Sequence, residues 1–278
     1  MKKILVPVDF SEHSKNALQV AAAFAKAHQA EILVVHMMGL SDAVLTRDED
    51  QEIAEAVFHM KLAKKQFRQF LDEDFLKGIR VSEMVQNYTV FEELNEIAKE
   101  QDADFIVMGS HGTTNLREEF VGSNTERVVR TAEVPVLVVK NSLGDFAIKQ
   151  VLFACDFKTE NVKPYREAMA FFEELGVQVH LVYVNLPADR FRSSKEIEER
   201  MDDFLKLAEF SKPTFRKELV IINGYTMESA LYDYAVKVGA DALAISTHGR
   251  KGLAHFFKGS IAEHLVNHTQ LPVFTFKM

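Results

Sequence analysis

Glycine spacing is the feature of this sequence that first indicates chemistry. Gly109 and Gly112 come directly after an apolar run at 105–108, and Gly122-Ser123 follow after nine further residues. A short apolar run before glycine is typical of a buried parallel strand, and glycine allows positive φ and a close approach to a ligand. The helix expected after Ser123 would offer free N–H groups and its positive dipole end to an anion. The spacing therefore predicts a cradle for the phosphates of a nucleotide.

The same spacing returns in the second half of the chain. Ser246-Thr247-His248-Gly249 correspond to Gly109-Ser110-His111-Gly112, and Gly259-Ser260 correspond to Gly122-Ser123. The chain has only 12 glycines, so matched landmarks in one register indicate a tandem repeat rather than coincidence. We predict one domain over residues 1–143 and a second over 147–278.

Composition limits the class of protein. Hydrophobic residues make up 47% of the 278 residues and charged residues 27%, which is usual for a globular protein. No apolar run is long enough to span a membrane, and Asp9 ends the first apolar stretch too early for a signal peptide. Cys155 is the single cysteine, so we expect a reducing cytoplasm and an inert buried thiol. The net charge of −8 argues against binding of nucleic acid.

Hydrophobic periodicity predicts alternating strands and helices in both halves. In the first half we expect strands at 3–9, 31–37, 80–88, 104–108 and 134–139, with helices at 15–28, 41–75, 90–100 and 123–131. In the second half we expect strands at 151–156, 177–184, 218–222, 242–246 and 271–276, with helices at 164–175, 194–210, 227–238 and 261–268. This order predicts an α/β fold of two doubly wound, Rossmann-like parallel sheets, each with strand order 3-2-1-4-5.

Such sheets bind ligands beyond the carboxyl ends of their strands, where the strand order reverses. Asp9 ends the first expected strand and Gly109 ends the fourth, and order 3-2-1-4-5 makes these strands neighbours. We therefore expect the carboxylate and the glycine loop to face one crevice. Two simpler interpretations stay open, because glycines before helices are often plain turn residues and Asp9 could cap the first helix.

With these motifs the chain resembles the universal stress protein family in its tandem two-domain form. The resemblance is carried by Val6-Pro7-Val8-Asp9-Phe10-Ser11, by the glycine spacing from Gly109 to Ser123, and by the Val-Pro-Val run at 134–139. It extends over nearly the whole chain. It implies that the fifth strands of the two domains pair, so that one chain forms a pseudo-dimer, and it leaves open whether two chains associate as a homodimer.

The resemblance also implies roles for residues of the first domain. Asp9 would hydrogen-bond the ribose or adenine side of the nucleotide, and Gly122 would hold the phosphates at the helix start. Any Mg²⁺ would arrive bound to the triphosphate. The full set implied for nucleotide binding in domain 1 is Pro7, Val8, Asp9, Met37, Met108, Gly109, Gly112, Gly122, Ser123 and Asn124.

The second half departs from this pattern. Ala154 replaces Pro7, and Ser246 replaces the first glycine. The β-carbon of Ser246 could obstruct a ligand that approaches the backbone at this position. Binding in domain 2 is therefore left open. The residues that would take part are Asp156, Val184, Gly249, Gly259 and Ser260.

Together with the glycine spacing, the resemblance implies a stress-response protein that binds ATP, or ADP or AMP, and acts as a sensor or regulator through an unknown protein partner. His111 and His248 are interpreted as polar loop residues, since no neighbouring nucleophile is indicated by the spacing. The chain also lacks the Gly-Lys-Ser/Thr phosphate loop and the G-x-G-x-x-G fingerprint. We expect ATP hydrolysis to be slow at most.

The alternatives are a slow ATPase or adenylyl-transferring enzyme, and a nucleotide-free scaffold for protein interactions.

Overall fold

The computed structural model describes residues 1–38, 49–87, 93–110, 122–141, 147–208, 219–247 and 271–278. The strands are β1 (Lys3–Val8), β2 (Glu31–Met38), β3 (Val81–Asn87), β4 (Phe105–Gly109), β5 (Val136–Val139), β6 (Gln150–Ala154), β7 (Gln178–Asn185), β8 (Val220–Asn223), β9 (Ala242–Thr247) and β10 (Val273–Lys277). The helices are α1 (Glu12–His28), α2 (Glu49–Phe70), α3 (Leu94–Glu100), α4 (Ser123–Thr131), α5 (Val162–Glu174), α6 (Ser194–Leu207) and α8 (Met227–Val238). The helix expected at 261–268 lies outside the described residues.

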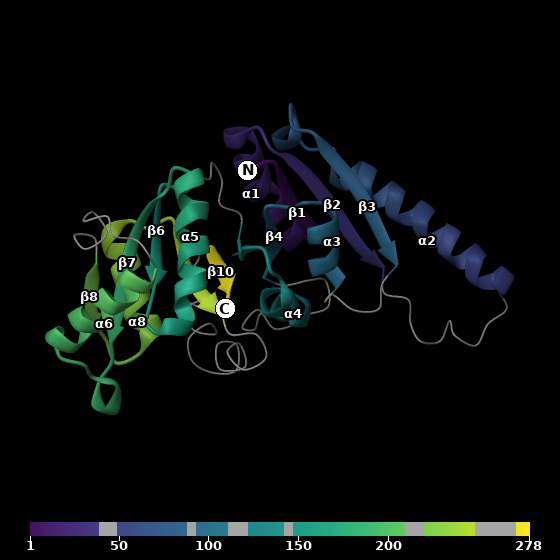
Figure 1. The fold of residues 1–278 in the computed structure, drawn as a ribbon. Helices are drawn as coiled ribbons and strands as arrows, with labels where there is room; N and C mark the ends of the chain where they lie inside the picture. The colour runs from purple at the N-terminus through teal and green to yellow at the C-terminus, as the bar shows by residue number, and fades with distance from the viewer. Residues whose placement is uncertain (39–48, 88–92, 111–121, 142–146, 209–218, 248–270) are drawn as a thin grey trace.

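The described strands form one ten-stranded sheet in the order β3-β2-β1-β4-β5-β10-β9-β6-β7-β8 (Figure 1). Each half has the predicted order 3-2-1-4-5, and within each half neighbouring strands run parallel. The halves meet where β5 and β10 pair antiparallel, with Leu137 opposite Phe274. The two fifth strands therefore join both halves into one continuous sheet.

Helix starts follow local capping chemistry. Helix α1 begins three residues earlier than the periodicity predicts, because the Ser11 side chain accepts a hydrogen bond from the Ser14 N–H at 3.2 Å. Helix α6 begins with a capping box, in which Ser193 and Glu196 bond each other's backbone N–H groups. The long helix expected at 41–75 is shorter in the described part, where α2 spans Glu49–Phe70 and is followed by a 3-10 turn at Asp74–Leu76.

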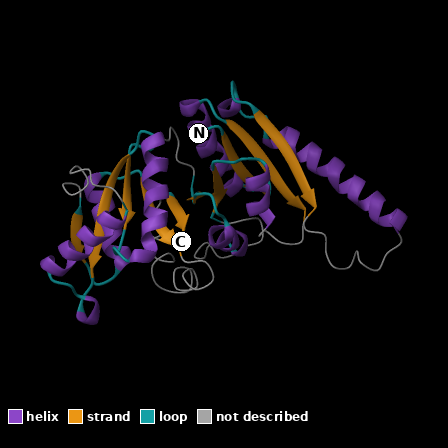
Figure 2. Ribbon diagram, viewed as in Figure 1, coloured by secondary structure: helices purple, strands orange, loops and turns teal. Residues whose placement is uncertain are grey.

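Helices cover both faces of the sheet, as expected for a doubly wound fold (Figure 2). One hydrophobic cluster includes residues of α1, α5 and α6 and extends across both halves. On the opposite face, α3 and α4 pack against the first half and α8 packs against the second. Among the described residues, no helix is both long and apolar enough to cross a membrane.

Candidate functional site

The end of β4 and the start of α4 lie together at the carboxyl edge of the first half. The Gly122 N–H donates to the Ser110 carbonyl at 2.8 Å, and the Ser110 N–H donates to the Val139 carbonyl at 2.9 Å. The hydroxyl of Thr125, a buried residue in the first turn of α4, donates to the Gly109 carbonyl at 2.9 Å. The fold therefore brings Gly109 and Gly122 to one place, as the sequence spacing predicts. Gly112 and His111 lie outside the described residues.

Gly109 is required by packing and does not have the left-handed backbone that we expected. Its φ is not positive, unlike that of Gly78, Gly176 and Gly239. A β-carbon at Gly109 would lie 2.9 Å from the carbonyl carbon and oxygen of His13 in α1. The expectation of positive φ was therefore wrong for Gly109, since the missing side chain allows α1 to approach β4 instead.

Asp9 lies just beyond β1, the neighbour of β4. One oxygen of its carboxylate accepts hydrogen bonds from the Ser11 N–H at 3.1 Å and from the Ser11 hydroxyl at 2.5 Å. Ser11 itself caps α1, so Asp9 supports that cap through Ser11. The structure therefore shows that Ser11 is the cap of α1 and that Asp9 supports it, while a role of Asp9 in ligand binding stays a prediction.

A left-handed phenylalanine follows this carboxylate in both halves, a feature that the sequence analysis missed. Phe10 has φ of 64° and Phe157, after Asp156, has φ of 55°. Such a backbone is uncommon for a bulky residue and costs on the order of 1–3 kcal/mol. Phe10 packs against His36 with ring centroids 4.5 Å apart, and Phe157 stacks on Tyr183 at 5.7 Å. Aromatic packing thus holds the turn that presents each carboxylate.

The apolar residues of the predicted adenine pocket lie on two faces of the sheet. Met108 belongs to the cluster under α3 and α4, and Met37 packs against the same cluster. Val8 instead belongs to the cluster under α1, on the opposite face, and Pro7 alternates with it along β1. The Val8 side chain is therefore separated from the two methionines. Its carbonyl lies 2.8 Å from Nδ1 of His36.

Ser123 and Asn124 are the first two residues of α4, with Gly122 as the N-cap at φ of −61°. Asn124 is exposed. Helix α4 has nine residues, and its free N–H groups lie at the edge where β4 ends. The start of α4 therefore lies at the edge where the sequence predicts an anion site, and that role stays a prediction.

The second half builds a different network at the equivalent edge. Asp156 accepts hydrogen bonds at one oxygen from the side-chain amide of Asn161 at 2.5 Å and from the Lys158 N–H at 3.1 Å. Its other oxygen lies 2.8 Å from the Lys158 ammonium group, and this hydrogen bond raises the pKa of Lys158. Ser246, the counterpart of Gly109, donates its hydroxyl to Asn161 at 2.5 Å. The hydroxyl that replaces the glycine therefore ties β9 to the start of α5.

A cavity of about 480 Å³ opens at this edge of the second half. Its apolar lining includes Ala154, Val184 and Ile245, which come from the ends of β6, β7 and β9. Asp156 lies at its border with basic residues that the sequence analysis did not identify, namely Lys158, Arg190, Arg192 and Arg200. Gly249, Gly259 and Ser260 lie outside the described residues, so only Asp156 and Val184 of the predicted second site are located.

Cys155 also borders this cavity and is buried, as predicted. Burial raises the pKa of its thiol to about 12, so the thiol stays protonated at neutral pH. Among the described residues, no three His, Cys, Asp or Glu side chains group closely enough to hold a metal ion.

Known proteins resemble this chain over both halves. The sequence model of the universal stress protein family matches residues 1–140 and 147–277. Universal stress protein MJ0577 of Methanocaldococcus jannaschii is 34% identical over 153 residues, covering 50% of this chain and 94% of that protein. Universal stress protein YxiE of Bacillus subtilis is 30% identical over 147 residues, covering 50% of this chain and 98% of that protein. The crystal structure of a universal stress protein from Archaeoglobus fulgidus has a TM-score of 0.66 at 21% identity, covers 99% of this chain and 96% of its own, and shares the fold.

Proposed function

Because the chain belongs to the universal stress protein family, with two family domains in tandem, we propose that its first domain binds an adenine nucleotide. ATP is the proposed ligand, with ADP and AMP as the other adenylates. Bound nucleotide would make the protein a sensor or regulator that acts through a protein partner, and hydrolysis would be slow at most. The proposed compartment is the cytoplasm.

The observation that carries this proposal is the contact between the end of β4 and the start of α4. The Gly122 N–H lies 2.8 Å from the Ser110 carbonyl, so the helix start and the strand end form one edge. A helix N-terminus offers free N–H groups and a positive dipole end, which suits the phosphates. Asp9 follows the end of the adjacent strand β1, and a carboxylate accepts hydrogen bonds from ribose hydroxyls. A divalent cation would enter with the triphosphate, because phosphate oxygens supply ligands that Mg²⁺ prefers.

Several features of the chain support binding over catalysis. Asp9 accepts hydrogen bonds from Ser11 at one carboxylate oxygen, and these bonds fix its position at the start of α1. The lone thiol, Cys155, lies in the other domain and is protonated at neutral pH. The antiparallel pairing of β5 with β10 supports the proposed intrachain pseudo-dimer, in which the two domains act as one unit.

The first test is the identity and stoichiometry of nucleotide released on denaturing the purified protein, read by mass spectrometry. We expect an adenylate bound to the first domain. Gly122→Leu should then weaken ATP binding by about tenfold or more in calorimetry, because the new side chain fills the N-cap position next to the phosphates. Thr131→Leu, at the far end of the same helix, is the matched control and should bind ATP as the wild type does.

The outcomes separate the alternatives. Release of ADP together with steady phosphate production would favour the slow ATPase. No released nucleotide and no uptake of ATP with Mg²⁺ would favour the nucleotide-free scaffold. Unchanged affinity in Gly122→Leu would contradict the proposed position of the phosphates.

A further inference from the structure

Helix α2 exposes apolar side chains that no part of the proposed nucleotide site uses. Between positions 57 and 62, four large apolar side chains are 43–62% exposed, namely Val57, Phe58, Met60 and Leu62. Phe67, near the end of the same helix, is fully buried. A helix that is apolar on more than one face is normally covered by other protein. This part of α2 therefore has the composition of a contact surface.

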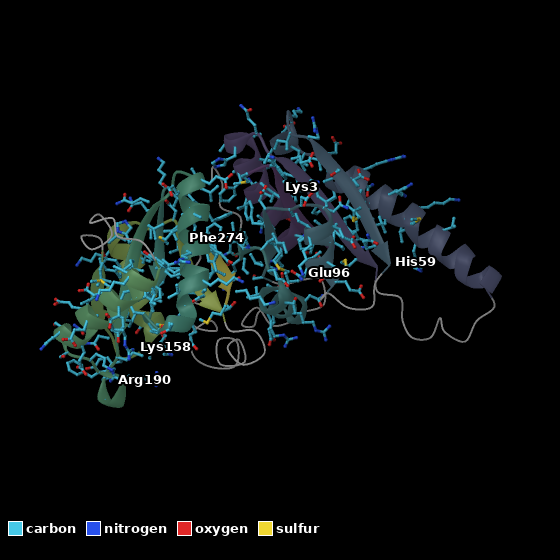
Figure 3. The ribbon with its side chains drawn as sticks, in the orientation of Figure 1. Lys3, His59, Glu96, Lys158, Arg190 and Phe274 are labelled. Carbon is cyan, nitrogen blue, oxygen red and sulfur yellow. The ribbon has the colours of Figure 1, made fainter. Side chains whose placement is uncertain are left out.

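Helix α2 lies at one end of the molecule, where a partner can reach it. It contacts β3, which is the last strand of the ten-stranded sheet on that side (Figure 1). Figure 3 labels His59 of α2 at the end remote from the second half. Strand β5 is already paired with β10 within the chain, so an association of two chains must use another surface.

One line of residues along α2 has the heptad spacing of helices that pair with each other. Its positions are separated alternately by four and three residues, which keeps them on one face of the helix. Phe58 belongs to this line and is nine residues, or about two and a half turns, from the buried Phe67, so the line faces away from the sheet. We call this line the α2 stripe, and it consists of Gln51, Glu55, Phe58, Leu62, Lys65 and Gln69.

The side chains described in the α2 stripe are all exposed, from Phe58 to Gln69. The stripe is also self-complementary in its chemistry. Three matched pairs stand at equal distances on either side of Met60: Gln51 with Gln69, Glu55 with Lys65, and Phe58 with Leu62. A two-fold axis brings residue i of one copy to residue j of the other and j to i. An antiparallel second copy therefore matches amide with amide, acid with base and apolar with apolar.

Charge along α2 favours the same direction of pairing. The acidic residues of the helix lie at positions 49–55, and the basic residues lie at positions 61–68. A parallel pair of such helices would put like charges together, whereas an antiparallel pair puts opposite charges together. Antiparallel helices also bring the positive dipole end of one helix to the negative end of the other.

We propose that two copies of this chain associate through antiparallel α2 helices, with Phe58 of each copy against Leu62 of the other and Glu55 of each against Lys65 of the other. The stripe is about 27 Å long at about 1.5 Å per residue. A contact of this length is smaller than a permanent interface, so we expect a dissociation constant on the order of 1–100 μM. The association needs no nucleotide, so failure of the proposed ATP site leaves it testable.

Sedimentation equilibrium of the full-length protein without added nucleotide tests this proposal, at concentrations that span the expected dissociation constant. We expect a reversible equilibrium between monomer and dimer. Lys65→Glu and Glu55→Lys should each weaken the dimer by about tenfold or more, because each puts like charges opposite each other at both ends of the contact. An equimolar mixture of the two variants should associate again, since opposite charges then face each other at both ends.

Lys64→Glu is the matched control, because it makes the same charge change at an exposed residue of α2 outside the stripe. It should dimerise as the wild type does. Phe58→Ala should weaken the dimer by about tenfold to a hundredfold and leave the stability of the monomer unchanged, since this side chain is 62% exposed in the single chain. Circular dichroism should show the same helix content in every variant.

Several results would overturn this proposal. A monomer at every concentration would exclude the association. A dimer that Lys65→Glu leaves intact would put the contact on another surface, and a mixture of the two charge variants that stays monomeric would exclude antiparallel pairing. A monomer that Phe58→Ala destabilises would show that the chain itself covers the α2 stripe.

Discussion

Gly109 and Ser246 occupy equivalent positions in the repeat but make different contacts. At Gly109 the absent side chain leaves room for the backbone of His13, so α1 lies close to β4. At Ser246 the side chain is present, and its hydroxyl bonds the buried Asn161 at 2.5 Å. One substitution in the repeat thus changes a helix contact from close backbone packing to a polar side-chain bond.

Gly109→Ala should lower the free energy of unfolding by about 1–3 kcal/mol, because backbone atoms of α1 must shift to admit the new β-carbon. Ser246→Ala is the control in the other half. It keeps the β-carbon and loses one hydrogen bond, so we expect a loss of about 1 kcal/mol. Urea denaturation followed by circular dichroism measures both. A wild-type midpoint for Gly109→Ala would contradict the proposed role of glycine at this position.

Among the elements, the junction of β4 and α4 determines the geometry of the proposed nucleotide site. The buried Thr125 hydroxyl bonds the Gly109 carbonyl, which is the last of β4. This bond holds the first turn of α4 against the strand whose end would face the ligand. The helix start is positioned by a side chain of the helix itself.

Thr125→Val should reduce stability by about 1–3 kcal/mol, because a buried carbonyl loses its partner while the shape of the side chain is kept. It should also weaken ATP binding, since α4 would no longer be fixed against β4. Thr131→Val removes a similar bond, to the Arg127 carbonyl at 2.9 Å, on the exposed end of the same helix, and should change neither quantity appreciably. Calorimetry and urea denaturation measure the two effects. Equal behaviour of the two variants would show that the bond does not position the helix.

At the scale of the whole molecule, phenylalanines join the two halves into one core. Phe274 of β10 lies with its ring centroid 5.2 Å from that of Phe172 in α5 and 6.5 Å from that of Phe24 in α1. Phe171 of α5 contacts Phe105 of β4 at 5.3 Å. Together with the β5–β10 pairing, these contacts make the halves neighbours in both the sheet and the core.

Phe274→Ala should lower stability by about 3–5 kcal/mol, because it leaves a cavity at the contact between the halves. The side chain is fully buried, so nothing from solvent replaces its contacts. We expect both halves to unfold in one transition in the wild type and to respond together to the substitution, as hydrogen exchange in each half would show. Phe191→Ala, at a residue 58% exposed, is the control and should have little effect. Destabilisation confined to the second half would contradict a shared core.

The amino-acid sequence by itself determined the elements, their order and the position of the glycine landmarks. Hydrophobic periodicity reports which residues are buried within one strand or helix, and the repeat provides the same pattern twice. Periodicity does not determine the boundaries of the elements: α1 starts at Glu12 because the Ser11 cap is a local bond that periodicity does not detect. The adjacency of Gly109 and Gly122 could also be predicted, because the glycine spacing puts one at the end of a strand and the other at the start of the helix that follows it.

Only the tertiary structure decided which residues distant in sequence meet. Three examples depend on how the helices cross the sheet. Gly109 contacts the backbone of His13, and Val8 and Met108 lie on opposite faces of the sheet. Lys158 and Arg200 line the same cavity. Sequence spacing reports the geometry within an element, whereas these contacts join elements through packing that no local pattern records. For that reason the glycine spacing could be read from the sequence, whereas the basic lining of the second-half cavity could not.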